Sequence, residues 1–135
     1  MFEKLFLTAG LCLDNYNDAG STINPHAALV WKPIGKLSAK VMYGQAFRAP
    51  SFAESYLNVA NGFIIGKENN KAEKIKTYEA EIACQLSKTI YIRVNGYYNF
   101  IDNLINLNLI FKKNTLVRLE YSNSSANTAS SGLEA

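Results

Sequence analysis

Apolar and polar residues alternate one by one along three stretches of this chain, and this pattern limits the fold more than any other feature. The stretches cover residues 37–48, 77–86 and 90–100. Strict alternation places apolar side chains on one face of a β-strand and polar side chains on the other. Each stretch has roughly the 9–11 residues that a tilted strand needs to cross a bilayer. We therefore expect an all-β protein whose sheet has two chemically different faces.

The composition excludes several classes of protein. The chain has 135 residues, of which 48% are hydrophobic, but its mean hydropathy is only -0.07. No run of residues approaches the ~18 apolar residues of a membrane-spanning helix, so a helical membrane protein is excluded. The net charge of +3 comes from 14 basic and 11 acidic residues scattered along the chain. Nucleic acid binding requires a basic cluster, and we expect no nucleic acid partner.

The connections between the expected strands differ in length. Residues 33–36 and 87–89 form tight turns, whereas residues 50–76 form a long polar link and residues 14–24 a medium one. Long loops on one side and short turns on the other are typical of outer-membrane barrels. Residues 5–13 alternate as well. We expect a strand there instead of a signal peptide, because no small-residue cleavage pattern follows.

The hairpin around the turn at residues 87–89 has a predictable register. If Leu86 lies opposite Ile90, each face of the hairpin pairs residues of one kind. The expected pairs are Ile82 with Val94, Ala80 with Gly96 and Tyr78 with Tyr98 on the apolar face, and Glu79 with Tyr97 on the polar face, with Glu81 diagonal to Arg93. Because both faces are satisfied at once, we predict this pairing.

Two phrases of the sequence resemble a known family. The first is FRAPSFAE at Phe47–Glu54 and the second is EKIKTYE at Glu73–Glu79. They resemble the phrases FRAPSFxEL and PEKSxTYExG in the barrels of TonB-dependent outer-membrane receptors, where the first ends one strand and the second opens the next. LTAGLCLDNY at Leu7–Tyr16 and IDNLI at Ile101–Ile105 are similar to further barrel segments of that family, in which the second segment continues an ascending strand. We therefore expect the alternation to continue over residues 105–111 toward a tip near residues 112–114. The resemblance extends over nearly the whole chain.

This resemblance implies a fold and a function. The fold is an antiparallel up-and-down meander of about six strands, a partial transmembrane β-barrel. Residues 1–135 would then be a fragment of the barrel domain, without plug and without signal peptide, and residues 121–134 would belong to a descending strand within which the chain stops. The implied function, in the cell outer membrane, is uptake of a scarce nutrient such as a ferric siderophore or cobalamin. We expect the isolated fragment to be inactive.

The resemblance also implies partners. They are outer-membrane lipid and, in the complete receptor, a plug domain, TonB and a small iron-chelate or cobalamin ligand. Heme-transporting members are similar in carrying a histidine in the loop after the FRAP phrase. Residues 48–76 contain no histidine, which disfavours heme.

The alternation assigns candidate site residues to the two faces of the sheet. Those expected to face lipid are Tyr43, Phe47, Tyr78, Ile82, Val94, Tyr98 and Phe100, and those expected to face the lumen are Glu79, Glu81 and Arg93. The lumen charges are either contacts for a plug or simply hydrated. The resemblance places Arg48 and Glu54 where the barrel mouth meets the extracellular loops, as part of a substrate vestibule. The alternative is that Pro50 ends a strand and that Arg48 caps its polar face.

Residues that commonly carry catalysis or bind metals form no recognisable motif in this sequence. No nucleophile stands beside a base in a known spacing, and His26, the single histidine, gives no ligand set. Cys12 and Cys84 fall on opposite phases of their strands, so we expect no bridge between them. We expect a protein that is not an enzyme and that has no cofactor and no metal.

One alternative comes from another class of protein. A soluble lipocalin-like β-barrel binding module would show the same alternation, with its apolar side chains turned inward to form a core. The two hypotheses differ in whether the apolar faces meet one another or remain uncovered.

Overall fold

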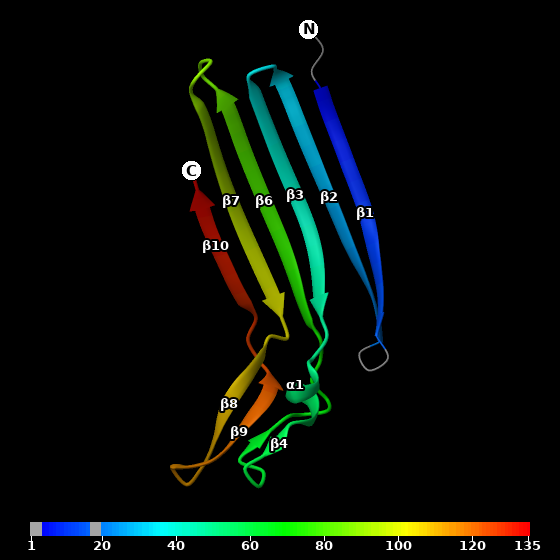
Figure 1. Ribbon diagram of the computed structural model, residues 1–135, viewed down its shortest axis with the longest axis vertical. Coiled ribbons are helices and arrows are strands. Elements are labelled where there is room, and N and C mark those ends of the chain that lie inside the picture. Colours follow the sequence, from blue (N-terminus) through cyan, green and yellow to red (C-terminus); the bar gives the residue numbers. More distant parts are fainter. Residues whose placement is uncertain (1–3, 17–19) are drawn as a thin grey trace.

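One antiparallel sheet makes up most of the molecule. The computed structural model describes residues 4–16 and 20–135. The main sheet has six strands in the order β1-β2-β3-β6-β7-β10 (Figure 1). Their bounds are β1 Lys4–Tyr16, β2 Gly20–Ile34, β3 Leu37–Arg48, β6 Glu73–Gln85, β7 Tyr91–Asp102 and β10 Thr128–Glu134. The predicted all-β meander of about six strands is confirmed, as an open sheet whose edges are β1 and β10.

The two faces of this sheet differ in chemistry. Cross-strand register carries one row of residues from strand to strand: Leu7, Leu29, Val41, Ala80 and Gly96. We call the face of this row the apolar face; it also carries Leu5, Leu11, Tyr43, Tyr78, Ile82, Val94 and Tyr98. The opposite side is the polar face, which carries His26, Lys40, Thr77, Glu79, Glu81, Arg93 and Tyr97.

The apolar face is uncovered. Among the described residues, the buried hydrophobic side chains are Ala83 and Ile105, whereas Leu7 is 73% exposed and Ile82 is 60% exposed. Tyr78 and Tyr98 are likewise exposed, Tyr43 beside them is half-buried, and these side chains enclose no interior. The core that a lipocalin-like module would need is therefore not formed by this sheet, and the apolar face must be covered by something else.

The register predicted for the hairpin of β6 and β7 is confirmed. The observed pairs are Ile82 with Val94, Ala80 with Gly96, Tyr78 with Tyr98 and Glu79 with Tyr97. Glu81 lies diagonal to Arg93, and the carboxylate and guanidinium are 3.9 Å apart. At the turn, the N–H of Leu86 donates to the carbonyl of Ile90 at 3.0 Å.

The medium connection predicted over residues 14–24 is wrong. β1 pairs with β2 along its full length, from Lys4 opposite Lys32 to Tyr16 opposite Gly20. Residues 17–19 of the predicted connection lie outside the described residues. β2 begins before Pro25 and runs through this proline. The proline is tolerated because β2 pairs with β3 only from His26 onward. The missing N–H of Pro25 therefore removes no hydrogen bond between β2 and β3.

Two further predictions about strand ends are corrected. β6 begins at Glu73, so the strand starts within the predicted link over residues 50–76. The stretch that continues from β7 does not ascend in the same sheet, because Asn103 has a φ of 58° and interrupts the strand. Beyond this break the chain enters a separate four-stranded sheet, which also includes two short strands within residues 58–65.

The second sheet has the order β4-β5-β9-β8. Its strands are β4 Asn58–Val59, β5 Ile64–Ile65, β8 Ile105–Lys112 and β9 Thr115–Asn123, and a short helix, α1 Phe52–Tyr56, precedes them. The tip between β8 and β9 falls at Lys113 and Asn114, as the sequence predicted. β9 then leads into β10, which returns to the main sheet beside β7.

The second sheet and α1 lie at one end of the main sheet, and the tight turns lie at the other (Figure 1). This is the predicted arrangement of long connections on one side and short turns on the opposite side. No helix in the described part of the chain is long and apolar enough to span a membrane.

Candidate functional site

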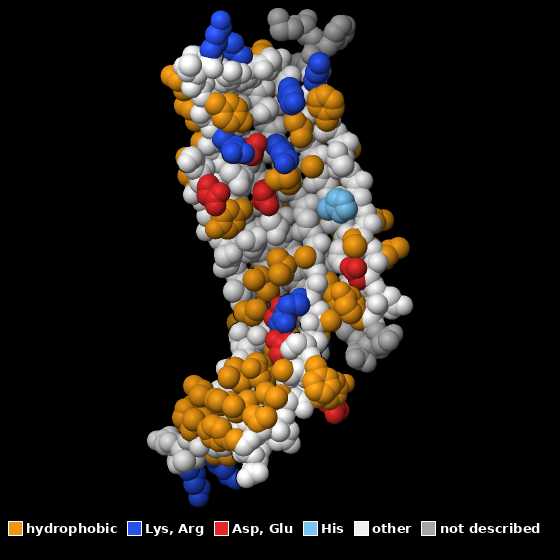
Figure 2. Space-filling model, in the orientation of Figure 1, with side chains coloured by type: hydrophobic (Ala, Val, Ile, Leu, Met, Phe, Trp, Pro, Cys, Tyr) orange, Lys and Arg blue, Asp and Glu red, His pale blue; other side chains and the backbone are white. Residues whose placement is uncertain are grey.

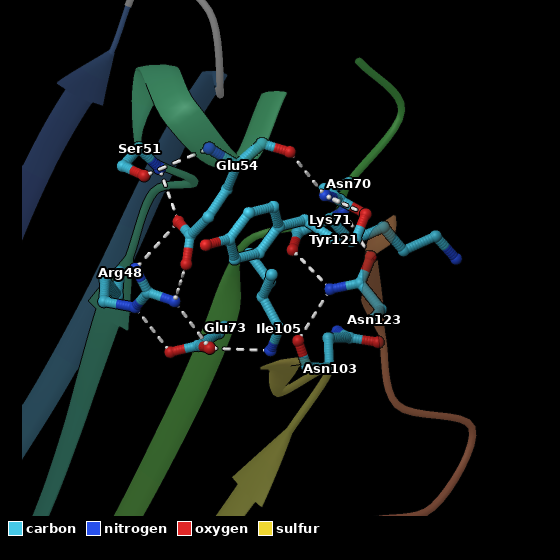
Figure 3. Close-up of polar contacts among 10 residues, drawn as sticks. All are labelled: Arg48, Ser51, Glu54, Asn70, Lys71, Glu73, Asn103, Ile105, Tyr121 and Asn123. Carbon is cyan, nitrogen blue, oxygen red and sulfur yellow. Dashed lines mark hydrogen bonds and ion pairs between the residues drawn. The ribbon is translucent and has the colours of Figure 1, made fainter. Parts of the chain in front are cut away.

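Arg48 joins two carboxylates where the main sheet meets the loops (Figure 3). Its Nε donates to Glu73 Oε2 at 2.6 Å and its Nη2 to Glu73 Oε1 at 2.7 Å. Nη1 and Nη2 donate to the two carboxylate oxygens of Glu54, each at 3.0 Å. All three guanidinium nitrogens are thus engaged, in two paired contacts of the kind that gives arginine its geometric specificity.

Local sequence explains why these three residues meet. Arg48 is the last residue of β3 and lies opposite Glu73, the first residue of β6. Pro50 follows the end of β3, and Ser51 then caps α1. The Ser51 hydroxyl accepts from the N–H of Glu54 at 3.3 Å, and the Glu54 carboxylate accepts from the N–H of Ser51 at 2.7 Å. This capping box aims Glu54 back at Arg48.

The hairpin of β8 and β9 is tied to the same cluster. The N–H of Ile105, the first residue of β8, donates to Glu73 Oε1 at 2.7 Å. Asn123, the last residue of β9, donates to the carbonyls of Asn103 at 2.6 Å and Lys71 at 2.8 Å, and it accepts from the N–H of Lys71 at 2.7 Å. One carboxylate and one amide therefore connect both ends of this hairpin to the start of β6.

Asn70 completes the network from the loop side. Its side-chain amide donates to the carbonyls of Glu54 and Tyr121, both at 3.0 Å. α1, β9 and the link between them are thus joined through backbone atoms. We call the set of Arg48, Glu54, Asn70, Glu73 and Asn123 the rim cluster.

The electrostatics of the rim cluster favour a structural role for its charges. The side chains of Glu73 and Glu54 are 5% and 14% exposed, and that of Arg48 is 44% exposed. The hydrogen bond from Arg48, followed by those involving Ser51, holds the pKa of Glu54 below its ordinary value against the opposing effect of burial. The guanidinium nitrogens of Arg48 already donate hydrogen bonds to the carboxylates of Glu54 and Glu73. The cluster therefore best fits the second interpretation of the sequence, in which Arg48 caps the polar face at the end of its strand. Contact of Arg48 or Glu54 with a ligand stays a prediction.

The residues predicted to face the lumen lie together on the polar face but apart from the rim cluster. Glu79 lies opposite Tyr97, while Glu81 lies opposite both Lys40 and Asn95. Figure 2 shows charged side chains over this part of the sheet together with the single histidine, which identifies the view as the polar face. The structure therefore brings the lumen candidates together with one another and not with Arg48.

The residues predicted to face lipid share the apolar face. Tyr43 and Tyr78 pack with ring centroids 5.1 Å apart. Phe47 continues the same phase but packs on Tyr16, at 5.4 Å between centroids. At the end of this face nearest the loops, the apolar row is interrupted by a charged residue, Lys76. Its ammonium lies 5.7 Å from the centroid of the Phe100 ring and 3.5 Å from the Asp102 carboxylate. Sequence reasoning missed this polar boundary, although Lys76 stands in the apolar phase of its strand.

Histidine and cysteine contribute no ligand cluster in the described part of the chain. No group of three or more His, Cys, Asp or Glu side chains there could hold a metal ion. His26 lies across the β1–β2 pair from Gly10, and a Cβ atom at Gly10 would collide with its imidazole. Cys12 and Cys84 are both free thiols, on strands β1 and β6 that are separated by β2 and β3.

A comparison with protein families decides what kind of sheet this is. The family model described as TonB dependent receptor-like, beta-barrel, matches residues 2–135. The chain belongs to the TonB-dependent receptor family. Its matched part is the β-barrel, so the resemblance seen in the FRAP and EKIKTYE phrases is confirmed. No curated protein sequence matches the chain.

Solved structures show the same fold. The TonB-dependent receptor barrel resembles the siderophore receptor PirA from Pseudomonas aeruginosa, with a TM-score of 0.80 and 22% identity over 96% of this chain. It also resembles the ferric enterobactin receptor PfeA in complex with BCV-L6, with a TM-score of 0.77 and 18% identity over 96% of this chain. A third similar structure is a double mutant of the Serratia marcescens hemophore receptor HasR in complex with its hemophore HasA and heme. Its TM-score is 0.70, with 15% identity over 98% of this chain. The chain spans 27%, 21% and 26% of these proteins, about a quarter of their length.

The TonB-dependent receptor barrel carries a second apolar surface, on its loops. Register in the second sheet places hydrophobic residues opposite one another, and we call this set the loop patch: Leu107 with Tyr121, Leu109 with Leu119, Ile64 with Leu119 and Phe111 with Leu116. Phe111 is 60% exposed. Figure 2 shows hydrophobic side chains gathered over β8 and β9 on the same side of the molecule as the polar face. The alternation from Ile105 to Phe111 signalled a strand, but no local signal placed it in a separate sheet.

Proposed function

We propose that this chain forms part of the barrel wall of an outer-membrane receptor that takes up a ferric siderophore. The observation that carries the proposal is an uncovered apolar face on strands of a TonB-dependent receptor barrel. β3 and β7 have 12 residues each. At about 3.3 Å per residue and a tilt of about 40°, such strands rise about 30 Å, which is enough to cross the ~25 Å apolar band of an outer-membrane barrel.

In this proposal the apolar face meets lipid and the polar face meets the lumen. Tyr43, Phe47, Tyr78, Ile82, Val94, Tyr98 and Phe100 would then contact acyl chains or the lipid interface. Glu79, Glu81 and Arg93 would contact water or a plug domain. The exposure of Ile82 supports the first assignment, and the ion pair between Glu81 and Arg93 supports the second. The second sheet would form part of the extracellular mouth.

The six strands would need neighbours to function. The edge strands β1 and β10 would present unpaired N–H and C=O groups to hydrocarbon, at a cost of several kcal/mol each. We therefore propose that the chain acts only as part of a closed barrel and is inactive as an isolated sheet. Its partners there are outer-membrane lipid, a plug domain in the lumen and TonB.

The proposed cargo is an iron chelate, and the proposed role is transport without covalent chemistry. The loop patch offers apolar and aromatic contacts at the mouth, on the side of the polar face, where the organic shell of a siderophore could bind. Two of the solved structures are described as a siderophore receptor and a ferric enterobactin receptor. Residues 49–72 of the loop region contain no histidine that could ligate heme iron. No observation favours cobalamin, so the iron chelate is our proposal.

A growth experiment tests this function. Cells that lack the polypeptide carrying this sequence would be grown without free iron and supplied separately with ferric siderophores or heme, and, in a cobalamin-requiring background with iron present, they would be supplied with cobalamin. We expect a growth defect with one ferric siderophore, restored by the intact gene, and recovery of the protein in the outer-membrane fraction. A defect with heme or cobalamin alone would overturn the assigned cargo. Recovery in the soluble fraction would overturn the membrane assignment.

A further inference from the structure

The hairpin of β8 and β9 carries most of the loop patch but has almost no apolar core of its own. Ile105 is the one buried hydrophobic side chain in this hairpin, whereas Leu109 is 57% exposed and Phe111 is 60% exposed. Its pairing with the other loop strands is short, because β9 meets β5 over only two residue pairs. Apolar packing therefore does not fix the angle at which the hairpin stands on the main sheet.

Hydrogen bonds at the base of the hairpin fix this angle instead. Asn123, the last residue of β9, lies opposite Ile105, the first residue of β8. Its Nδ2 donates to the carbonyls of Asn103 at 2.6 Å and Lys71 at 2.8 Å, and its Oδ1 accepts from the N–H of Lys71 at 2.7 Å (Figure 3). Asn103, with its φ of 58°, is the residue at which the chain leaves the main sheet. One side chain therefore ties the entrance of the hairpin to the link before β6.

A second amide holds β9 two residues further into the hairpin. Asn70 precedes Lys71 in the link, and its Nδ2 donates to the carbonyls of Tyr121 and Glu54, both at 3.0 Å. Tyr121 is itself a member of the loop patch, opposite Leu107. The link therefore contacts β9 at residues 121 and 123. We call Asn70 and Asn123 the amide clamp.

The amide clamp has no donor left for a ligand. A side-chain amide carries two N–H donors, and in both residues these donors are directed at two backbone carbonyls. The clamp can therefore influence a bound molecule only through the position of the hairpin.

We propose that Asn123, supported by Asn70, is a positioning residue for the cargo: it sets the direction in which the loop patch faces and thereby the affinity, without touching the ligand. A patch held in one orientation binds more tightly than a mobile one, because the hairpin is ordered before the ligand arrives. This role differs from that of Arg48 and Glu73, which join the loop region to the end of the sheet. The proposal rests on the proposed function, in which the loop patch binds the iron chelate.

Uptake kinetics in cells that make the complete polypeptide carrying this sequence test the proposal. The probes are the radioactive ferric complexes of enterobactin, a catecholate, and of ferrichrome, a hydroxamate. The test variants are Asn123→Ala and Asn123→Asp, the second of which keeps the volume of the side chain but loses both donors. The matched control is Asn108→Ala, because the Asn108 amide donates at 2.8 Å to Ser122 Oγ within the same hairpin and makes no hydrogen bond to the link.

We expect both Asn123 variants to raise the half-saturating concentration of the transported chelate about tenfold, while the maximal rate of uptake stays within about twofold of the wild-type rate. A residue with a merely structural role would give the opposite result. Loss of folded receptor lowers the maximal rate and leaves the half-saturating concentration unchanged. Asn108→Ala should match the wild type in both quantities.

A pair of nitroxide labels reports the position of the hairpin directly. The labels would be placed at Lys112 in the hairpin and at Ala129 in β10, both exposed, with Cys12 and Cys84 replaced by serine. We expect a narrow distribution of distances in the wild type and in Asn108→Ala, and a broad one in Asn123→Ala.

Three outcomes would overturn the proposal. The first is an unchanged half-saturating concentration in Asn123→Ala, and the second is an equal rise in Asn108→Ala. The third is a distance distribution in Asn123→Ala that is as narrow as in the wild type. Failure of the proposed function looks different, because the wild type itself would then take up neither chelate and no ferric siderophore would support growth.

Discussion

Glu73 offers the sharpest test of how the loops are held, because its substitution removes several contacts at once. Its carboxylate accepts two hydrogen bonds from Arg48 and one from the N–H of Ile105. Hydrogen bonds to a charged group contribute about 1.5–3 kcal/mol each. Arg48 is 44% exposed and keeps Glu54 as a partner, so we discount the ion-pair contribution strongly. Glu73→Ala should then reduce the local stability of the loops by about 2 kcal/mol.

Hydrogen exchange of backbone amides measures this local stability directly. A loss of about 2 kcal/mol corresponds to roughly 30-fold faster exchange in the affected segments, which we expect to be α1 and the hairpin of β8 and β9. Glu73→Gln keeps an acceptor for the Ile105 N–H but loses the charge, so exchange should accelerate by only about fivefold, for a loss of about 1 kcal/mol. The centre of the sheet around Tyr78 should be unaffected in both variants.

Glu68→Gln is the matched control for this experiment. Glu68 is an exposed loop carboxylate that forms no ion pair with the described residues, and its substitution should change stability by less than about 0.5 kcal/mol. The reasoning would be refuted if Glu73→Ala left exchange in the hairpin of β8 and β9 unchanged. It would be refuted equally if Glu68→Gln had the same effect as Glu73→Ala.

Three further predictions concern close contacts and pH. Gly66→Ala would place a Cβ 2.8 Å from the backbone nitrogen of Tyr56, and protease nicking within residues 52–66 should become at least about tenfold faster, as expected for a clash of more than ~1.4 kcal/mol. Gly132→Ala would bring a Cβ to 2.5 Å from the ring of Tyr97, and the free energy of unfolding in urea should fall by about 1–3 kcal/mol. Adding Tyr97→Ala should relieve this loss, and an equal loss in the double variant would contradict the clash. The pKa of Glu54 is lowered, chiefly by its hydrogen bond from the neighbouring guanidinium, so its contribution is present above the unfolded carboxyl pKa of about 4.3 and is lost as pH falls through the lower folded value. Exchange protection of α1 should hold from neutral pH to about pH 5 and decline below about pH 4, and constant protection down to pH 2 would count against this role.

Sequence alone predicted the register of β6 and β7 because two local constraints agree. The tight turn at residues 87–89 limits the offset of the strands, and a shift of one residue would turn Tyr78 and Ile82 to the polar face. The start of β2 was missed because Pro25 and its polar neighbours look like a loop when read locally. They lie in a strand because Asn24 donates to the Asp14 carboxylate at 2.9 Å, across the pair with β1. That contact depends on a neighbour ten positions away.

The candidate site was predictable only in pieces. Arg48 and Glu54 stand in one recognisable phrase, and the capping box of Ser51 and Glu54 has a local signature. Glu73 was assigned to the link, and its contact with Arg48 spans 25 residues. The second sheet depends on a parallel pairing of Ile64 with Leu119, which no local pattern indicates. Such pairings are set by tertiary packing and not by periodicity.

The central claim is that the apolar face contacts lipid and the polar face contacts water. Nitroxide labels placed one at a time along β6, from Thr77 to Gln85, would test it in outer-membrane vesicles containing the complete polypeptide, with Cys12 and Cys84 replaced by serine. We predict that labels at Tyr78, Ile82 and the other even positions collide mainly with dissolved oxygen, and that labels at odd positions such as Glu81 collide mainly with a polar nickel chelate. Equal accessibility at odd and even positions, or the reverse alternation, would contradict the account.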